Sequence, residues 1–322
     1  MLKTVVSEIA KRFVVILFVV TGTFLLARAA PGDPAAFMAG EAGSGDPAFI
    51  EHLRAQMGLD KPLLVQLGYY LRDLASLDLG RSYRENRPVF DMIAERLPNT
   101  LALAGAAFLL ALLFGTAAGF LAAIHRGRLT DRVISIGSVL FFSSPYYWVA
   151  LMAILLFSGK LGWFPSHGIE TIGAGYTGLR AVADYLHHLV LPATASALFS
   201  MAIYARLVRA SMIETSNALF VKAAHAKGMA PMRIWLRHVL RTSLLPITTM
   251  AGVQAGQLVA GTILTETVFA WPGIGRLMYD ALGARDYNVV IGVFIVTSVI
   301  VILSNLVVDL LYRVVDPRTR AA

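Results

Sequence analysis

Six long apolar runs, separated by polar segments, set the pattern of the chain. They cover residues 13–30, 100–124, 133–157, 189–208, 244–270 and 289–312. Each run is close to the roughly 20 residues that a helix needs to cross the apolar core of a bilayer. The pattern therefore predicts an all-α, polytopic membrane protein with six transmembrane helices.

Basic residues gather in alternate loops between these runs. The loop 125–132 holds three arginines, and the stretch 209–243 is strongly cationic, whereas the loops 159–188 and 271–288 hold two basic residues each. Cytoplasmic loops of membrane proteins carry an excess of Lys and Arg. We therefore expect a multi-pass protein of the cell inner membrane with both its N and C termini in the cytoplasm.

Composition narrows the function classes. Apolar residues make up 57% of the 322 residues, which is typical of an integral membrane protein and not of a soluble one. The net charge of +8 does not indicate a nucleic-acid partner, because the cations lie in short loops beside the apolar runs. The chain has no cysteine, so disulfides and thiolate metal sites are excluded.

Residues 1–30 are expected to form an N-terminal segment and the first transmembrane helix. Arg28, near the end of the run, can extend its guanidinium to the outer interface. A second interpretation stays open. The basic start, the apolar core and the sequence Ala-Arg-Ala at 27–29 are also compatible with a cleaved signal peptide.

Residues 31–97 are polar and are expected to form an extracytoplasmic helical domain. Asp46 and Pro47 suit the start of a helix that Gly58 ends, and a second helix is expected at 63–76. Residues 98–322 then form a core of five transmembrane helices, which contains the cytoplasmic stretch 209–243.

The segment 217–246 is too patterned for an ordinary loop. Asn217 is expected to cap a short helix at 218–227, and Gly228 suits a left-handed residue after it. Pro231 then fits the first turn of a second helix. Three arginines spaced four apart form one stripe on that helix, as expected at a membrane surface: Arg233, Arg237 and Arg241. The alternative is a basic loop that only obeys the topology rule.

This segment resembles the "EAA" loop of ABC importer permeases. Ala223, Ala224 and Gly228 match the motif, and the Leu-Pro at 245–246 opens the next helix. In that family the loop docks on an ATPase subunit. The resemblance implies an ATPase-coupling segment made of Lys222, Ala223, Ala224, His225, Ala226, Lys227 and Gly228. Two departures are present: Lys222 replaces the Glu of the motif, and Pro246 lies a few residues later than in sugar-type permeases. Together with the string ARDYNVVIG at 284–292, they favour a resemblance to the dipeptide, oligopeptide and nickel branch.

Further strings similar to this branch follow in order along nearly the whole chain. They are PGDP at 31–34, DLG at 78–80, ERLPNT at 95–100, ETVFAWPGIG at 266–275, ARDYNVVIG at 284–292 and DPR at 316–318. The chain is thus similar to the permease subunits of binding-protein-dependent transport systems, the inner membrane components with a type I ABC importer fold.

The resemblance carries expectations about function and partners. It implies a permease subunit that forms half of a translocation pathway for di- or oligopeptides. The expected partners are a second, homologous permease as heterodimer partner, two ABC ATPases, a periplasmic binding protein and the lipid bilayer. ATP and Mg²⁺ would bind to the ATPases, with no cofactor in this chain. Asp33, Trp271, Pro272 and Gly273 are candidates for docking the binding protein.

Glu266 is the most unusual acid of the apolar runs, since it lies near the outer end of the fifth. A carboxylate there is costly unless it faces protein or water. It is a candidate for the translocation path or its gate, and equally for a structural acid at the interface. Small residues of the same run, Gly252 and Gly256 among them, allow close helix packing.

Catalytic and metal sites are not indicated. The sequence contains neither a P-loop nor an H-E-x-x-H motif, so we assign no catalytic and no metal-ligating residue. A secondary transporter and an intramembrane enzyme are the alternatives, but the apolar runs have few acids and offer no nucleophile with a base. The solute stays open among peptides, glutathione-like conjugates, nickel chelates and other small solutes.

Overall fold

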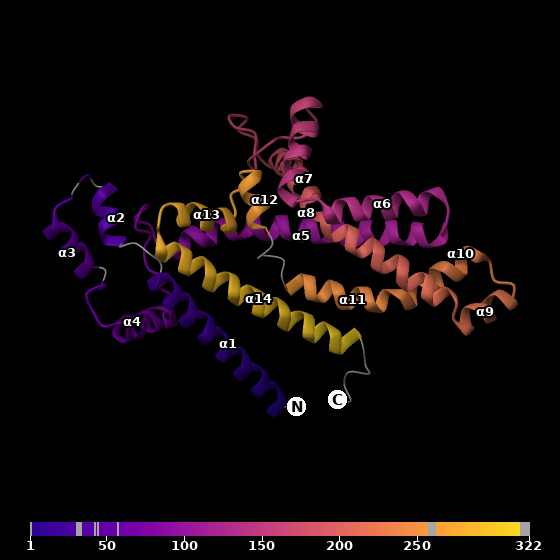
Figure 1. Ribbon diagram of the computed structural model, residues 1–322, viewed down its shortest axis with the longest axis horizontal. Coiled ribbons are helices and arrows are strands. Elements are labelled where there is room, and N and C mark those ends of the chain that lie inside the picture. Colours follow the sequence, from indigo (N-terminus) through magenta and orange to yellow (C-terminus); the bar gives the residue numbers. More distant parts are fainter. Residues whose placement is uncertain are drawn as a thin grey trace. The chain divides into compact units, whose positions relative to one another are not determined.

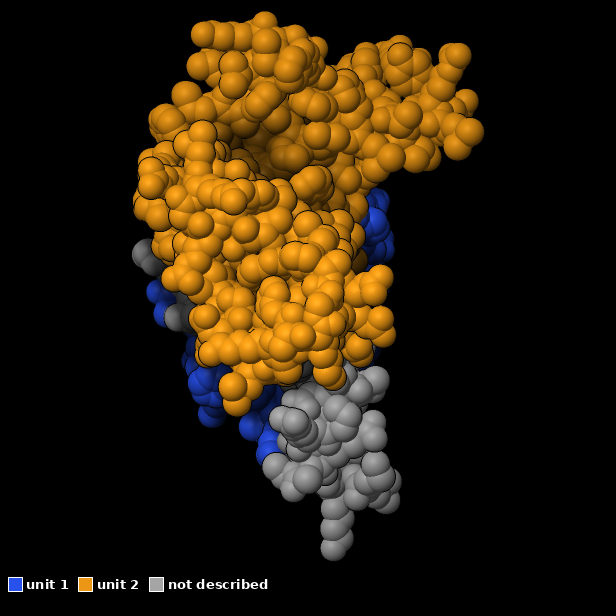
Figure 2. All heavy atoms as spheres, turned by 90° about the vertical axis from the view of Figure 1, so that its right-hand side faces the viewer, with its two compact units in different colours: residues 1–100, 272–302 blue, residues 101–271, 303–322 orange. Residues whose placement is uncertain are grey.

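The structure, a computed structural model, describes residues 2–29, 34–41, 43, 45–56, 58–256 and 262–315. Its contacts divide the chain into two compact units, drawn in two colours in Figure 2. Unit 1 comprises residues 1–100 and 272–302, and unit 2 comprises residues 101–271 and 303–322. The described residues are helical apart from turns, loops and one isolated bridge between Arg81 and Pro88. The all-α prediction is confirmed.

Unit 1 holds the helices from both ends of the chain. They are α1 (Leu2–Ala29), α2 (Pro34–Glu41), α3 (Pro47–Gln56), α4 (Leu63–Ala75), the first turns of α5 (Val89–Ile124), α13 (Ile274–Gly283) and most of α14 (Tyr287–Val315). Val20 of α1 packs in one apolar cluster with Ile291 and Ile295 of α14, and Figure 1 shows these helices side by side. Tyr70 of α4 joins this cluster. The polar segment is thereby fixed to two membrane helices.

The helices expected in the segment 31–97 are present where the structure describes it. The Asp46 carboxylate accepts a hydrogen bond from the Ala48 N–H at 3.1 Å, and Gly58 has a φ of +62°. Helix α4 matches the second expected helix. Residues 31–33, which include the docking candidate Asp33, and Met57 lie outside the described residues. Helix α5 begins at Val89, before the expected boundary, and contains Pro98.

Unit 2 is built around the long helix α8 (Leu179–Ser216). The other helices are the rest of α5, α6 (Leu129–Ser143), α7 (Tyr146–Ala153) with its π-helical continuation Ile154–Lys160, α9 (Leu219–Ala226), α10 (Pro231–Ile234) with the π-helical segment Trp235–Leu240, α11 (Arg241–Gly256) and α12 (Ile263–Val268). One apolar cluster joins Ala111, Tyr204 and Val208 to residues of the cationic segment, Val221 and Ile234.

Two glycines let α5 lie directly on α8. A Cβ at Gly115 would come within 2.8 Å of the Met201 carbonyl oxygen, and one at Gly119 within 2.5 Å of the Ala205 carbonyl oxygen. These atoms belong to the backbone and cannot turn aside. Gly115 and Gly119 thus form the small-residue seam of the bundle. This G-x-x-x-G lies in the second apolar run, whereas the pair Gly252 and Gly256, expected to allow close packing, lies in the fifth.

Gly119→Ala is therefore expected to destabilise the protein. The added methyl forces α5 away from α8, and overpacking of this kind costs about 1–3 kcal/mol. The matched control is Gly105→Ala on the same helix, where a Cβ meets no atom within 4 Å. Thermal unfolding of the purified variants measures the difference. Equal melting temperatures for the two variants would show that the close approach does not contribute to stability.

One of the expected spans is not a single straight helix, and another is described only in part. Helices α6 and α7 meet at an angle of 110° around Ser144 and Pro145. In the fifth, α11 and α12 flank residues 257–261, which lie outside the described residues. Among the described residues, α5, α8 and Tyr287–Leu306 are long and apolar enough to cross a membrane, and the bent pair can supply a fourth span. The apolar stretch of α1, Val14–Leu25, is shorter. The count of six spans stays a prediction.

The local signals of the segment 217–246 are partly confirmed. Gly228 has a φ of +70°, and Pro231 occupies the first turn of α10. The prediction that Asn217 caps the short helix is wrong: Asn217 ends α8, and its side-chain amide donates to the Ile213 carbonyl at 3.1 Å. The reason is that α8 extends far beyond its apolar run.

The second helix of the segment also differs from expectation. Residues 231–256 are helical throughout, so Pro246 lies inside α11 and does not open a new helix. The three arginines of the stripe are exposed, as expected. They therefore lie on the helix that continues into the fifth apolar run. A movement of this stripe can be passed along α11 without a flexible connection.

Candidate functional site

Helix α9 is attached to the core of unit 2 by one buried face. Val221 and Ala224 are 2% and 5% exposed, and both pack in the cluster that contains Met212 of α8 and Ile234 of α10. The Met229 N–H donates to the Ala224 carbonyl at 3.3 Å, which closes the end of the helix. A displacement of α9 must therefore shift α8 and the helix that leads into α11.

The opposite face of α9 is open to solvent. Six of the seven predicted coupling residues are exposed: Lys222, Ala223, His225, Ala226, Lys227 and Gly228. Ala224, the seventh, faces the core. This division follows from the helical period, because Val221 and Ala224 lie three residues apart on one side. The predicted segment is thus brought together as one surface, with Ala224 holding it from behind.

Sequence reasoning missed two residues of this surface. Leu219 is 82% exposed and Phe220 is 47% exposed, at the start of α9. Large apolar side chains that stay exposed beside cations are typical of a protein-binding surface. The available signal was the Leu-Phe pair itself, which with Val221 gives three consecutive large apolar residues in a short helix that can bury only one side.

A buried ion pair fixes the start of α6 to α8. The side chain of Asp131 is 6% exposed, and its two carboxylate oxygens accept hydrogen bonds from Arg209 Nε at 2.5 Å and Nη2 at 2.9 Å. The Gly127 N–H and the Ser135 hydroxyl donate to the same carboxylate. Sequence analysis did not select Asp131, although it is the single acid in a loop with three arginines.

A neutral cavity of about 450 Å³ opens between helices of unit 2. Three hydroxyl groups form a network in it: Tyr146 Oη lies 2.6 Å from Thr265 Oγ1, and Ser196 Oγ lies 2.7 Å from the same atom. Phe108 and Phe199 supply apolar walls. The described residues that line the cavity carry no charge. Such a lining can hydrogen-bond to polar neutral groups without holding an ion.

Glu266 lies in the same helix as Thr265 but is 0% exposed. One carboxylate oxygen accepts a hydrogen bond from the Thr262 hydroxyl at 2.9 Å, four residues earlier. Thr262 and Thr265 are among the described residues lining the neutral cavity, whereas Glu266 is not. This geometry favours the structural interpretation of Glu266. Its role in a path or gate stays a prediction.

The docking candidates after α12 are mostly covered. Trp271 is 0% exposed, clusters with Leu103 and Leu189, and places its ring 5.4 Å from that of Tyr185. Gly273 is buried and Pro272 is half-buried. The Trp271 side chain is thus committed to the core of unit 2 in this structure. Its role in docking, like those of Pro272 and Gly273, stays a prediction.

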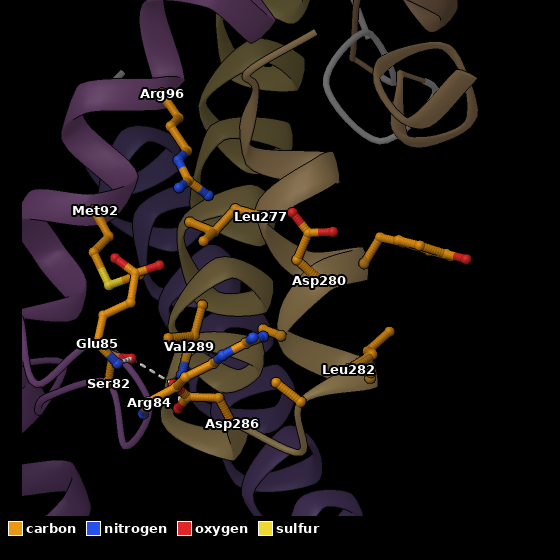
Figure 3. A pocket seen from close by; sticks show the side chains of 14 residues that line it. Ser82, Arg84, Glu85, Met92, Arg96, Leu277, Asp280, Leu282, Asp286 and Val289 are labelled. Carbon is orange, nitrogen blue, oxygen red and sulfur yellow. Dashed lines mark hydrogen bonds between the residues drawn. The ribbon is translucent and has the colours of Figure 1, made fainter. Parts of the chain in front are cut away.

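Unit 1 contains a charged pocket of about 870 Å³. Its ionic side chains include Arg84, Glu85, Arg96 and Asp280. Figure 3 shows Arg96 extending from α5 toward Leu277 and Asp280 of α13. Asp286 belongs to the floor, where its carboxylate accepts a hydrogen bond from the Ser82 hydroxyl at 2.5 Å. The pocket offers charges of both signs, which suits a solute that carries both.

Histidines and carboxylates do not gather into a metal site in the described part of the chain. His187 Nε2 lies 2.8 Å from the Trp163 carbonyl oxygen, and His188 Nδ1 lies 2.8 Å from the Asp184 carbonyl oxygen. Both histidine rings, which lie on α8, are thus hydrogen-bonded to backbone carbonyl groups.

Comparison with known proteins agrees with this geometry. Residues 115–321 match the family model "Binding-protein-dependent transport system inner membrane component", and residues 1–104 match the model of its N-terminal region. The chain is 39% identical over 314 residues to the di/tripeptide transport system permease protein DppB of Pseudomonas aeruginosa, with 92% of this chain and 93% of that protein covered. It is 37% identical over 317 residues to the dipeptide transport system permease protein DppB of Escherichia coli, with the same coverage.

A solved structure gives a similar result for the fold. The inward-facing MetNI methionine ABC transporter contains a chain that matches with a TM-score of 0.55 at 20% identity, over 70% of this chain and 97% of that one. At this identity the match concerns the fold alone. It agrees with the expected importer permease fold.

Proposed function

The chain belongs to the family of binding-protein-dependent transport system inner membrane components, and on that premise we propose that it is a permease subunit of an ATP-binding cassette importer for di- or oligopeptides. It is a multi-pass protein of the inner membrane. The names of its relatives, which concern peptide, dipeptide and di/tripeptide transport, support the choice of solute.

The proposed assembly has four further subunits. A second, homologous permease completes the pathway, two ATPases bind ATP and Mg²⁺, and a periplasmic binding protein delivers the peptide. In this assembly the chain crosses the membrane six times and keeps both termini in the cytoplasm. The alternating charge of its loops supports that topology.

The surface of α9 is the observation that carries the proposal. It presents Leu219, Phe220 and Lys222 outward, while Val221 and Ala224 fix the helix to the core of unit 2. In the proposed mechanism an ATPase grips this exposed face. When the two ATPases close on ATP, α9 moves with them, and its buried contacts pass the movement to α8 and α11. The pathway thereby switches between outward and inward access.

Each unit contains a pocket that suits a different part of a peptide. The charged pocket of unit 1 can receive the ammonium and carboxylate ends of a peptide, because it holds acids and arginines together. The cavity of unit 2 can contact the amide groups through hydroxyls. Neither lining includes a described cluster that would hold a nickel ion. Peptide is therefore the solute that the geometry supports best.

The direct test is purification of the chain from its native membrane with whatever binds to it, followed by an ATPase assay. We expect a second permease and P-loop ATPases to copurify, and ATP hydrolysis to rise when the cognate binding protein is added with peptide. A chain that purifies alone and moves solute on an ion gradient without ATP would refute the proposal and favour a secondary transporter.

A further inference from the structure

A second pocket of unit 1 contains three buried polar atoms without a hydrogen-bond partner. The pocket measures about 590 Å³ and is bordered by the end of α1, by α4, by the loop before α5 and by the start of α14. The atoms are Arg28 Nε, Tyr70 Oη and Gln66 Oε1, and their residues all line this pocket. Buried polar atoms are nearly always paired, because an unpaired one loses its hydration without compensation. Three in one pocket indicate a ligand.

The position of the pocket indicates where that ligand comes from. Arg28 lies in the last turn of α1, directly after the apolar stretch Val14–Leu25. Its guanidinium stands 5.4 Å from the centre of the Phe24 ring, which stacks on Tyr70 of α4 at 5.4 Å. The charge pattern places this end of α1 at the outer face of the membrane. Arg28 and Tyr70 thus lie at the level of the outer headgroups.

The other charged groups of the pocket are already engaged. Asp73 accepts hydrogen bonds from Arg72 at 3.2 Å, Asp78 accepts one from the Gly80 N–H at 2.8 Å, and Arg81 donates to the Asn86 carbonyl at 2.9 Å. Arg28 is not among the cations for which an acidic partner is described. Among the described residues, therefore, no anionic acceptor is seen for Arg28.

The three buried polar atoms without a hydrogen-bond partner indicate the chemistry of the ligand. Arg28 Nε and the Tyr70 hydroxyl can both donate, which suits the oxygens of a phosphate. Gln66 Oε1 can only accept, so the group next to the phosphate must carry a donor. We propose that this pocket binds the headgroup of an outer-leaflet phospholipid, with its phosphate on Arg28 and Tyr70 and an ethanolamine-type ammonium on Gln66. Choline lacks N–H groups and does not meet the last requirement.

A lipid held here would reinforce unit 1. It would add a polar link between the end of α1 and α4, which already meet where the Phe24 ring stacks on the Tyr70 ring. The start of α14 is held at the same pocket, since the Tyr83 hydroxyl donates to Asn288 Oδ1 at 3.0 Å. The site is independent of transport, because it needs only the membrane and the topology of α1.

Native mass spectrometry and thermal unfolding of the full-length chain test the proposal. The purified chain is measured with phosphatidylethanolamine, with phosphatidylcholine, with inorganic phosphate and with dialanine. We expect phosphatidylethanolamine to be retained and to raise the melting temperature, and choline lipid to be retained roughly tenfold less. Arg28→Gln should weaken retention about tenfold or more, as loss of a charged hydrogen bond does. Tyr70→Phe removes one hydroxyl only and should weaken it less.

The matched control is Arg180→Gln, which removes an exposed arginine in the first turn of α8, outside the pocket lining, and should behave as wild type. If Arg28→Gln fails to fold, the lipid retention of the nearly isosteric variant Tyr70→Phe tests the proposal instead. Wild-type lipid retention by the folded variants would overturn the proposal. Equal effects of the two lipids would also overturn it, as would protection by inorganic phosphate alone. Protection by dialanine in place of lipid would reassign the pocket to peptide.

Discussion

Gly228→Glu is expected to abolish the stimulation of ATP hydrolysis in the assembled importer, with at least about a tenfold loss, while the chain still inserts in the membrane. Gly228 ends α9 with a φ of +70°, a conformation that costs an L-residue about 1–2 kcal/mol. The new carboxylate would also stand on the exposed face that we propose for the ATPase. The measurement is ATPase activity of the reconstituted complex with and without binding protein.

Gly228→Asn separates the two causes of this loss, the strained backbone conformation and the new negative charge. Asparagine tolerates the left-handed conformation and adds no charge, and the space around the Gly228 Cβ position is open within 4 Å. We therefore expect Gly228→Asn to keep most of the stimulation. Normal stimulation and normal uptake in Gly228→Glu would refute the assignment of α9 to coupling.

Asp131→Asn is expected to have the largest effect on stability. Removing one partner of a buried ion pair leaves the other charge uncompensated, which costs about 3–5 kcal/mol. Asp131 is the buried side of the pair, at 6% exposure against 33% for Arg209. The loss should appear as a lower melting temperature of the purified chain and a lower yield from membranes. Glu214→Gln, an exposed acid on α8, is the control and should change little.

The double variant Asp131→Asn with Arg209→Gln tests why Asp131→Asn is expected to lower stability. If the cost of the single variant comes from the unpaired arginine, the double variant should recover part of the stability. A double variant whose loss equals the sum of the two single losses would show that the residues act independently. That result would contradict a functional contact between α6 and α8.

Local chemistry made several elements predictable. Helices α3 and α4, the left-handed Gly228 and Pro231 in the first turn of α10 all follow from residues within one or two turns of the feature itself. The motif alone selected the segment 222–228, and the structure places six of its seven residues on an exposed surface. Leu219 and Phe220 were missed because a large apolar residue usually signals the core, and only the packing of α9 leaves them outside.

Long-range contacts made other features unpredictable. Gly252 and Gly115 have similar sequence surroundings, and only the course of α8 decides that Gly115 and Gly119 meet a backbone. Trp271 was expected at a docking surface, yet Leu103 and Leu189, far away in the sequence, cover it. Asn217 has the composition of an N-cap, but α8 reaches it from the other side.

The sequence by itself determined that this protein belongs in a membrane, which segments are apolar, and which loops carry the cationic residues. These properties depend on local composition and spacing, because insertion and charge asymmetry act segment by segment. Tertiary structure alone decided the Asp131–Arg209 pair and the gathering of unpaired polar atoms in the Arg28 pocket. Each of these arises from residues distant in the chain, whose meeting depends on how the helices pack.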